Sequence, residues 1–552
     1  MDDKFCQIYL IQPDYEVNCE DLLRNYAETY LAETEVLYLS SQSIFYMKIF
    51  NVRYLAEADK ITIEKEGITS EELMERAATL VFEEIHSRLN NEPVPIKIIC
   101  GIGNNGGDGL VVGRLLIEQG YDVKIYVVNF TKERSRDFLS NYDKIKQLGV
   151  SWPTLLKGQE DFPELTPKDF VIDAIFGIGL NRPPEDWVAE LIEYINASGA
   201  FVLSIDMPSG LFSTRIAAPG DAVIKANYTL SFQAPKLVFF LPQTAEYVGD
   251  LQVLNIGLDR EFLASAPAEA QLIDKEEAIN LYIPRKTFSH KGDYGHSLII
   301  GGSYGKIGSI SLTARATLRS GAGLVTIYSP ECGYEILQSV LPEAMMLIDE
   351  GKKELVNINF DIEPDVICFG MGAGTSTGTL KAYEALLKKV KMPMVIDADG
   401  LNMLAVKKEL IKLVPENSVL TPHPKELERL IGKWKDDFDK LEKAKAFTKK
   451  HKLILVLKDA HTITISGDNL YVNNTGNPGM ATAGAGDVLA GVITGLISQK
   501  YEPLIAAVFG TYLHGKAGDI MASKLSYQGM IAGDIADNIG LAFLDLFKND
   551  EA

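Results

Sequence analysis

The sequence predicts an α/β protein made of two domains, each built on a parallel β-sheet. Its 552 residues exceed what one hydrophobic core normally serves, so more than one domain is expected. Strand-like apolar runs alternate with helix-like runs, and this alternation starts twice along the chain. Glycine-rich turns follow several of the strand-like runs, at the end of the strand where parallel sheets bind ligands.

The first alternation runs from residue 47 to about 260 and predicts a doubly wound sheet with helices on both faces. Its predicted strands are 96–100, 122–128, 170–174, 200–205, 228–233 and 251–256. Its predicted helices are 52–66, 70–90, 109–119, 135–147 and 187–197. We therefore assign residues 47–260 to the first domain.

The second alternation begins near residue 275, after a charged connector around 259–280, and predicts a domain over 275–552. Its predicted strands are 297–301, 323–328, 365–370, 393–397, 418–421, 453–457, 462–465 and 469–472. Its predicted helices are 308–320, 378–389, 425–431, 438–450 and 483–497. Residues 1–46 are acidic, tyrosine-rich and free of glycine, and they are either an extension of unknown role or a small helical cap.

Composition excludes several classes of partner. The formal net charge of −21 disfavours nucleic acid and anionic membranes, so an anionic ligand must be held by local groups. The five cysteines are scattered without CxxC spacing, which fits a reducing cytoplasm better than a disulfide framework or a zinc site. No run approaches the roughly 18 apolar residues of a membrane span, and the N-terminus lacks the pattern of a signal peptide.

The turn Gly484-Ala485-Gly486-Asp487 precedes an apolar helix-like run. Free amide groups at a helix start attract phosphate, and a carboxylate placed there can act as a general base. This pattern is typical of phosphoryl transfer. The alternative is a core helix with a glycine cap.

Polar residues also gather at four predicted turns of the first domain. The turns contain Asn104 to Asp108, Asp173, the stretch Asp206 to Gly210, and Lys236. Parallel strands would bring these turns together, where Asn105, Asp173 and Ser209 offer oxygen ligands to a hard cation. Asp206 and Lys236 can move protons there. The alternative for Asp173 and Asp206 is helix N-capping.

The segments N-N-G-G-D-G, D-A-I-F-G-x-G-L-x-R-P, D-x-P-S-G and A-P-K resemble the YjeF N-terminal family. Members are NAD(P)HX epimerases with a Rossmann-like fold, which interconvert the R and S hydrates of reduced nicotinamide dinucleotides and hold K⁺. The resemblance implies K⁺ ligation by Asn105, Asp173 and Ser209, and catalysis by Asp206. It implies that the hydrated dinucleotide contacts Asn104, Asn105, Gly106, Gly107, Asp108, Gly177, Ile178, Gly179, Leu180, Asn181, Arg182, Pro183 and Asp206.

The second domain carries a further ordered set of motifs. These are G-G-S-Y-G at 301–305, G-M-G-A-G at 370–374, D-A-D-G-L-N at 397–402, T-P-H-P-K-E at 421–426, L-K-D-A-H-T at 457–462 and the turn ending at Asp487. Together they resemble the ADP- or ATP-dependent NAD(P)HX dehydratases of ribokinase-like fold. The resemblance implies that Ala314, Gly374, His423 and Asp487 contact the hydrated dinucleotide. It also implies adenine nucleotide contacts from Lys458, Asp459, Ala460, His461, Thr462 and Gly486.

We therefore expect a cofactor-repair enzyme that acts on NADHX and NADPHX, contains K⁺ and Mg²⁺, and forms a homo-oligomer. Asp487 would deprotonate the ring hydroxyl of the S hydrate, the oxygen would take the terminal phosphoryl group of ADP, and phosphate would leave. Asp397 and Asp399 would place Mg²⁺ through water or else cap a helix, and His423 would contact the substrate or else pack in its loop. The choice between ADP and ATP stays open.

Two other functions stay open at this point. One is an ordinary small-molecule kinase of ribokinase-like fold that acts on a sugar or vitamin alcohol. The other is a first domain that binds nucleotide without chemistry, against which the presence of Asn105, Asp173, Asp206 and Ser209 argues.

Overall fold

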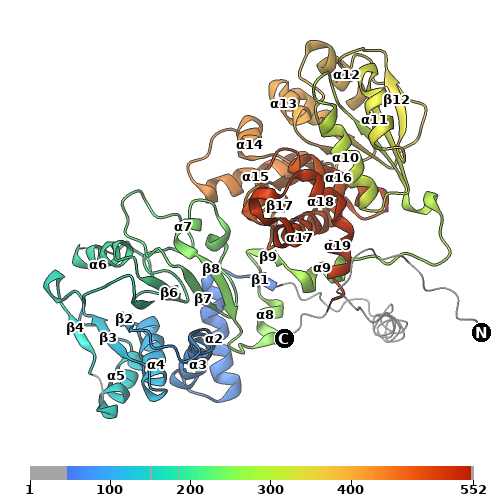
Figure 1. Ribbon diagram of the computed structural model, residues 1–552. Coiled ribbons are helices and arrows are strands. Elements are labelled where there is room, and N and C mark those ends of the chain that lie inside the picture. Colours follow the sequence, from blue (N-terminus) through green and yellow to red (C-terminus); the bar gives the residue numbers. More distant parts are fainter. Residues whose placement is uncertain (1–46, 150–151, 185, 549–552) are drawn as a thin grey trace, which may run out of the picture. The chain divides into compact units, whose positions relative to one another are not determined.

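The computed structural model describes residues 47–149, 152–184 and 186–548 (Figure 1). The predicted extension over residues 1–46 lies outside the described residues. Two β-sheets organise the described chain, one of seven strands and one of eleven. The prediction of an α/β protein built on parallel sheets is confirmed.

The seven-stranded sheet is parallel throughout. Its order is β4 (Thr154–Leu156), β3 (Val123–Val128), β2 (Ile96–Cys100), β5 (Phe170–Ala174), β6 (Phe201–Ile205), β7 (Tyr228–Phe232) and β8 (Asp250–Leu254). The chain adds strands to one side of β2 and then returns to add β5 on the other side. This reversal between β2 and β5 opens a crevice at the carboxyl ends of both strands.

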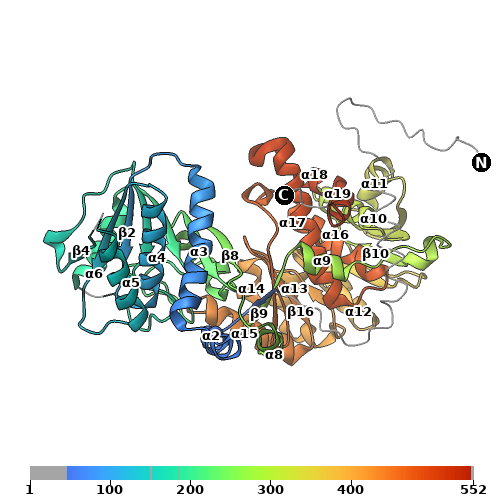
Figure 2. The same cartoon turned by 90° about the horizontal axis from the view of Figure 1, so that it is seen from below.

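Alternating side chains of these strands bury two apolar faces. Ile98 and Cys100 face α3 (Ser70–Leu89), α4 (Asn104–Glu118) and α5 (Arg136–Leu148), whereas Ile99 faces α6 (Asp186–Ala197). The helices therefore cover both faces of the sheet (Figure 1, Figure 2). The remaining helices of this region are α2 (Val52–Glu66), the 3₁₀ turns η2 (Gln159–Asp161) and η3 (Leu237–Phe240), α7 (Ala245–Val248) and α8 (Arg260–Ser265).

The eleven-stranded sheet is parallel from β12 to β16 and antiparallel from β16 through β18. Its order is β1 (Met47–Ile49), β9 (Ala270–Ile273), β18 (Asn469–Asn473), β17 (Ile463–Ser466), β16 (Ile454–Leu457), β15 (Val419–Leu420), β14 (Met394–Ile396), β13 (Val366–Phe369), β10 (His296–Ile300), β11 (Leu324–Pro330) and β12 (Met345–Asp349). Here the chain order reverses between β10 and β13, which opens a second crevice at their carboxyl ends.

Helices also cover both faces of the second sheet. One face packs against α10 (Ile307–Arg319), α16 (Ala485–Ser498), α17 (Pro503–Gly529), α18 (Ala532–Asp537) and α19 (Ile539–Asp545). The other packs against α12 (Thr377–Leu387), α13 (Asp399–Val406), α14 (Pro424–Ile431) and α15 (Asp437–His451). Further helices are α9 (Lys275–Leu281), η4 (Lys291–Tyr294), η5 (Glu331–Gly333), α11 (Tyr334–Val340), η6 (Lys408–Leu413) and η7 (Pro478–Met480).

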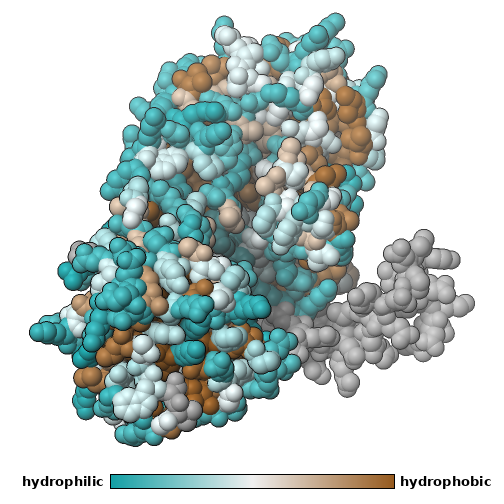
Figure 3. Space-filling model, turned by 60° about the vertical axis from the view of Figure 1, so that its left-hand side comes forward, coloured by the Kyte–Doolittle hydropathy of each residue, from teal (hydrophilic) through white to brown (hydrophobic). Residues whose placement is uncertain are grey.

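The predicted connector around 259–280 is not a plain linker, because it contains α8, β9 and most of α9. β9 pairs with β18 and with β1, so the start of the first alternation and part of the connector join the second sheet. Figure 3 shows one face of the molecule, on which hydrophobic patches are separated by largely hydrophilic surface. Among the described residues, we find no helix with both the length and the apolar character that a membrane span requires.

Candidate active sites

The N-N-G-G-D turn is the first turn of a helix. The sequence predicts helix only from residue 109, but α4 begins at Asn104, directly after β2. A Cβ at Gly106 would lie 2.0 Å from the Gly101 carbonyl oxygen, and one at Gly109 would lie 2.6 Å from the Ala174 Cβ. Glycine at these positions therefore lets α4 approach the sheet closely. The first amide groups of α4 face the crevice as donors for an anion.

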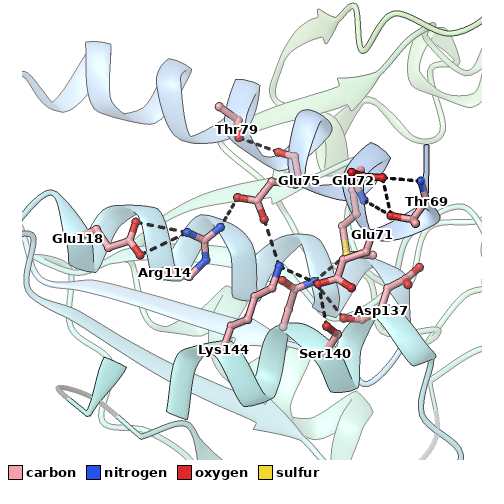
Figure 4. Close-up of polar contacts among 12 residues, drawn as sticks. Thr69, Glu71, Glu72, Glu75, Thr79, Arg114, Glu118, Asp137, Ser140 and Lys144 are labelled. Atoms are coloured by element: carbon pink, nitrogen blue, oxygen red, sulfur yellow. Dashed lines mark hydrogen bonds and ion pairs between the residues drawn. The ribbon is translucent and has the colours of Figure 1, made fainter. Parts of the chain in front are cut away.

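A polar network holds this helix in place (Figure 4). Arg114 of α4 pairs with Glu75 of α3 and with Glu118. Lys144 of α5 pairs with Glu71 of α3 at 2.7 Å. Three helices are thus joined behind the turn, so the network fixes the direction of α4 without contributing to the crevice itself.

Asn105 carries unused hydrogen-bonding capacity inside the protein. Its side chain is buried, and neither its Oδ1 nor its Nδ2 has a hydrogen-bond partner among the described residues. A Cβ at Gly177 would lie 3.3 Å from Asn105 Cγ and 3.2 Å from Asp206 Oδ2, so these three residues meet. Buried amides normally have partners, and an unpartnered one fits a site completed by a bound ligand or cation.

Asp173 and Ser209 are joined beside Asn105. The Ser209 amide donates to Asp173 Oδ2 at 2.9 Å, and the Ser204 hydroxyl donates to the same oxygen at 2.7 Å. The Phe176 amide donates to Ser209 Oγ at 2.8 Å, which brings the Asp173 cluster next to Gly177. Burial raises the pKa of Asp173, and its hydrogen bonds oppose this shift. Asp173 thus links strand ends, and it does not cap a helix.

Asp206 and Lys236 form a buried ion pair. Lys236 Nζ lies 2.6 Å from Asp206 Oδ1 and also donates to Ser231 Oγ at 2.6 Å. The Ile178 amide donates to Asp206 Oδ2 at 3.3 Å. The φ of Asp206 is 65°, a left-handed conformation that costs energy for a residue other than glycine and is typical of functional sites. Helix capping does not explain Asp206, because no helix starts there.

Further carboxyl groups surround this pair. Burial, Asp206, Asp59 and Asp137 raise the pKa of Asp108 well above its usual value. Burial and Asp206 raise the pKa of Asp59 to about 6, whereas Lys236 opposes the shift. Asp59 is not among the residues predicted from the sequence. Helical periodicity could have indicated Asp59, because Leu55, Ala58 and Thr62 are the buried residues of α2 and Asp59 lies on the same side of the helix.

The predicted contacts over 177–183 form the rim of the first crevice. Gly177 and Ile178 touch Asp206, as described, whereas Asn181 and Arg182 are exposed. Asn104 is also exposed, but Gly106, Gly107 and Asp108 are buried. The structure therefore brings together five of the predicted residues, which we call the first site: Asn105, Asp173, Asp206, Ser209 and Lys236. An exposed rim lies beside this site.

The second site lies at the start of α16. Gly484 precedes this helix with a φ of 93°, and no side chain caps it. A Cβ at Gly486 would lie 3.2 Å from Lys458 Nζ and 3.6 Å from Asp397 Oδ2. Lys458 pairs with the buried Asp397 at 2.8 Å. Uncapped amides beside a lysine can serve as donors to a phosphate group.

Asp487 stands in the first turn of α16. Burial first, and then Asp397 and Asp399, raise its pKa to about 6, whereas a hydrogen bond with Ser309 and the charge of Lys458 oppose the shift. The Thr313 hydroxyl donates to the Asp487 carbonyl at 3.0 Å and fixes the backbone. A carboxyl group with this pKa is suited to act as a general base near neutral pH.

Asp399 and Asp397 have different roles. Asp399 Oδ2 accepts the Gly374 amide at 2.9 Å and lies 3.4 Å from Lys306 Nζ, so it ties two loops together. Neither aspartate caps α13, whose N-cap is Ala398 without a side-chain hydrogen bond. Asp397 is the one that faces Gly486. The described residues include no group of three or more His, Cys, Asp or Glu side chains arranged to hold a metal.

His423 is the N-cap of α14. Its Nδ1 accepts the amides of Lys425 at 3.1 Å and Glu426 at 3.4 Å, and the Glu426 carboxylate accepts the His423 amide. Burial and the charge of Lys458 lower the pKa of His423, which favours the neutral ring. With Nδ1 as acceptor, the proton must be on Nε2, which lies 3.4 Å from Glu426 Oε1.

The other predicted residues of the second domain differ in accessibility. In the segment after β16, Asp459 and Ala460 are exposed, while His461 Nδ1 lies 3.3 Å from the Asn473 carbonyl. Burial lowers the pKa of His461. Ala314 is fully buried within the core formed by α10 and α16, so the structure does not place it at the surface of the site.

Sequence comparison matches both halves of the chain. A family model described as "YjeF-related protein N-terminus" matches residues 70–238, and one described as "NAD(P)H-hydrate dehydratase" matches residues 297–540. The bifunctional NAD(P)H-hydrate repair enzyme of Moorella thermoacetica is 35% identical over 508 residues, covering 89% of this chain and 96% of that protein. Its counterpart in Escherichia coli is 33% identical over 480 residues, covering 85% and 88%.

Among solved structures, an ADP/ATP-dependent NAD(P)H-hydrate dehydratase from Bacillus subtilis is 26% identical, covers 50% of this chain and 97% of that one, and has a TM-score of 0.44. The two bifunctional relatives establish the family of this chain, because each is more than 30% identical to it and matches most of its length, including both domains. The chain belongs to the family of bifunctional NAD(P)H-hydrate repair enzymes.

Proposed function

We propose that this chain repairs hydrated NADH and NADPH through two reactions at two sites. The first site interconverts the R and S hydrates, and the second site dehydrates the S hydrate while it converts ADP to AMP and phosphate. The observation that carries the proposal is Asp487, whose raised pKa and position beside Lys458 and Gly486 fit a base next to a phosphate site. Family membership supports both reactions.

At the first site, the dinucleotide binds at the start of α4 and along the rim at 177–183. The diphosphate is held by the first amides of α4, and Asp206 exchanges a proton with the hydrated ring. Lys236 holds the Asp206 carboxylate in place through the ion pair at 2.6 Å. Asn105, Asp173 and Ser209 would hold K⁺, which offsets negative charge at the crevice; the unpartnered Asn105 Oδ1 fits this role.

At the second site, Asp487 takes the proton of the ring hydroxyl. The oxygen forms a bond to the terminal phosphorus of ADP, and the bond from that phosphorus to AMP breaks. The carbon–oxygen bond of the ring then breaks, phosphate leaves, and loss of a proton from the neighbouring carbon restores the dihydronicotinamide. Lys458 and the amides at Gly486 stabilise the transferred phosphoryl charge. Gly374 and His423 contact the dinucleotide.

Asp397 would hold Mg²⁺ through water, and this ion would neutralise nucleotide phosphate charge. Asp399 binds the Gly374 amide and Lys306 through its Oδ2, whereas Asp397 pairs with Lys458 through Oδ1 and has its Oδ2 beside Gly486. The segment Lys458 to Thr462 would contact the adenine nucleotide. We further propose that residues 47–260 and 275–552 carry the two activities, and that the enzyme is a cytoplasmic homo-oligomer.

The test uses the full-length protein with the purified S hydrate. We expect recovery of the reduced-nicotinamide absorbance with ADP or ATP, dependent on Mg²⁺, with AMP and phosphate as products from ADP. Asp487→Asn should abolish this recovery but leave interconversion of the R and S hydrates intact, which controls for folding. Phosphorylation of a sugar or vitamin alcohol without recovery of NADH would instead indicate the ordinary kinase.

A further inference from the structure

The loop between β18 and α16 leads directly into the second site. It covers residues 474–484 and contains the 3₁₀ turn η7. Just before the loop, the Asn473 amide donates to the Thr462 carbonyl, and the Asn473 carbonyl lies 3.3 Å from His461 Nδ1. At its end, Gly484 precedes α16. The loop therefore connects the segment proposed to contact the adenine nucleotide with the turn proposed to bind phosphate.

One face of α17 packs closely against this loop. The Thr475 hydroxyl donates to the Tyr512 carbonyl at 2.9 Å. A Cβ at Gly515 would lie 2.7 Å from the Thr475 carbonyl carbon, and one at Gly518 would lie 2.8 Å from Met480 Cγ. Glycine at these two positions of α17 therefore lets the loop lie directly on the helix.

Asp519 follows on the same face of α17 and binds the loop through both of its oxygens. Its Oδ2 accepts the Gly476 amide at 3.0 Å, and its Oδ1 accepts from Asn477 Nδ2 at 2.9 Å. Asn477 Oδ1 in turn accepts the Gly479 amide at 3.0 Å and caps η7. We call Asp519 and Asn477 the loop clamp, because their three hydrogen bonds fix the loop to the helix.

Short turns connect the loop clamp to the first turn of α16. The Ala481 amide donates to the Pro478 carbonyl at 3.2 Å, and the Ala485 amide donates to the Thr482 carbonyl at 3.4 Å. Little slack is therefore left in the chain between the clamp and α16. A displacement of the loop is passed on to Asp487 and to the amides that face the proposed phosphate group.

We propose that Asp519 and Asn477 are positioning residues of the dehydration site, which hold the loop so that the first turn of α16 is aligned with the terminal phosphoryl group of the nucleotide. The proposal rests on the proposed dehydration reaction. Both residues act through the backbone of the loop rather than by contact with substrate. Because reacting groups must be closely aligned, a small displacement of the loop lowers the rate of the chemical step more than it weakens binding.

The hydrogen-bond pattern allows the two side chains of the clamp to be exchanged. Asp519→Asn leaves one acceptor oxygen for two donors, and Asn477→Asp brings two carboxylates together. The double variant has a donor and an acceptor at each contact again, in reversed order, so it can retain all three hydrogen bonds. It also keeps the net charge of wild type.

The experiment compares the two single variants, the double variant and Asp545→Asn in the full chain, well below the Tm of each. Asp545 is the matched control, because it is a carboxylate that pairs with Lys516 of the same helix at 3.0 Å. Dehydration of the S hydrate at saturating ADP gives kcat and KM. Epimerisation without nucleotide reports the integrity of the fold. Hydrogen exchange over residues 474–484 reports on the loop without reference to activity.

We expect each single variant to lower kcat for dehydration by about tenfold and to leave KM for the S hydrate within about twofold, because Gly374 and His423 lie on other loops. Hydrogen exchange of the loop should be faster in both single variants. The double variant should regain most of the kcat and the slow exchange. Asp545→Asn should match wild type, and epimerisation should be unchanged throughout.

A wild-type kcat in Asp519→Asn would overturn the proposal. A double variant no better than the single variants would overturn it as well, because the two side chains would then not act through their hydrogen bond. If Asp519→Asn also loses epimerisation, it is misfolded, and kcat of Asn477→Asp and of the double variant decides by the same criteria. Failure of wild type to dehydrate the S hydrate would refute the proposed function and with it the catalytic role of the clamp. Hydrogen exchange distinguishes that outcome from failure of the clamp itself, which would leave exchange of the loop unchanged in the single variants.

Discussion

Substitutions at His423 separate its role as the N-cap of α14 from its proposed contact with the dinucleotide. Nδ1 caps α14 by accepting the Lys425 and Glu426 amides, and the proton on Nε2, which lies 3.4 Å from Glu426 Oε1, is the donor that we propose for the dinucleotide. Asn retains both a cap and a donor, Asp retains the cap but loses the donor, and Ala loses both. The three variants therefore predict different combinations of stability and activity.

The magnitudes follow from the contacts. Loss of an N-cap costs about 1 kcal/mol, which for a domain of this size lowers Tm by ~2–4 °C. Loss of the donor leaves an acceptor on the bound dinucleotide unpaired, which costs about 1.4 kcal/mol or tenfold in kcat/KM. His423→Asn should therefore have a Tm near wild type and retain most of its activity. His423→Asp should lose about tenfold in kcat/KM at unchanged Tm. His423→Ala should have both a lower Tm and a lower kcat/KM.

The assay combines thermal unfolding with steady-state dehydration of the S hydrate at saturating ADP. Epimerisation by the same protein is the internal control, because His423 belongs to the second site. Equal kcat/KM for the Asp and Asn variants would refute the donor role. An unchanged Tm for His423→Ala would refute the capping argument.

Three further predictions concern the ionic groups of the two sites. Lys236→Met leaves the buried Asp206 charge unpaired, so we expect the free energy of unfolding to fall by about 3–5 kcal/mol and most of the epimerisation activity to be lost. Denaturant titration measures the stability, and chromatography of the hydrates measures the epimerisation. A variant as stable as wild type would contradict this prediction. Because the working form of Asp487 is the carboxylate and its pKa is about 6, the dehydration rate should fall as pH drops through 6, and a rate independent of pH between 5 and 8 would exclude Asp487 as the base. Asp399→Asn weakens the charged contact with the Gly374 amide that orders the Gly374 loop. We therefore expect KM for the S hydrate to rise several-fold, with little effect on KM for ADP. Equal changes in both constants would instead argue for a role at the nucleotide.

Much of the fold could be predicted because central strands of parallel sheets are continuous apolar runs. β2, β5 and β16 coincide with the predicted strands within one residue. Two edge strands, β4 and β12, were missed. β4 has only three residues, and β12 is a short apolar run that periodicity alone does not assign to a strand or a helix. The start of α4 was missed because its glycines indicate a turn by propensity, whereas tertiary packing needs them inside the helix.

The candidate sites were predicted where each residue ends a strand. Asp173 and Asp206 were found this way, whereas Asp487 was found because a glycine turn precedes an apolar helix. Asp59 was missed because it approaches the pair from a helix far away in the chain, which only the packing of α2 determines. Ala314 came from family resemblance alone, and its complete burial gives it no visible route to the substrate.

The central claim is that two separate sites act in sequence, so the R hydrate is repaired only after epimerisation at the first site. The most direct measurement is recovery of NADH from the pure R hydrate with ADP, comparing wild type with Asp206→Asn and subtracting the reaction without enzyme. We predict that the variant repairs the S hydrate at the wild-type rate but recovers R hydrate no faster than the background. Recovery of the R hydrate by Asp206→Asn at the wild-type rate would contradict the account.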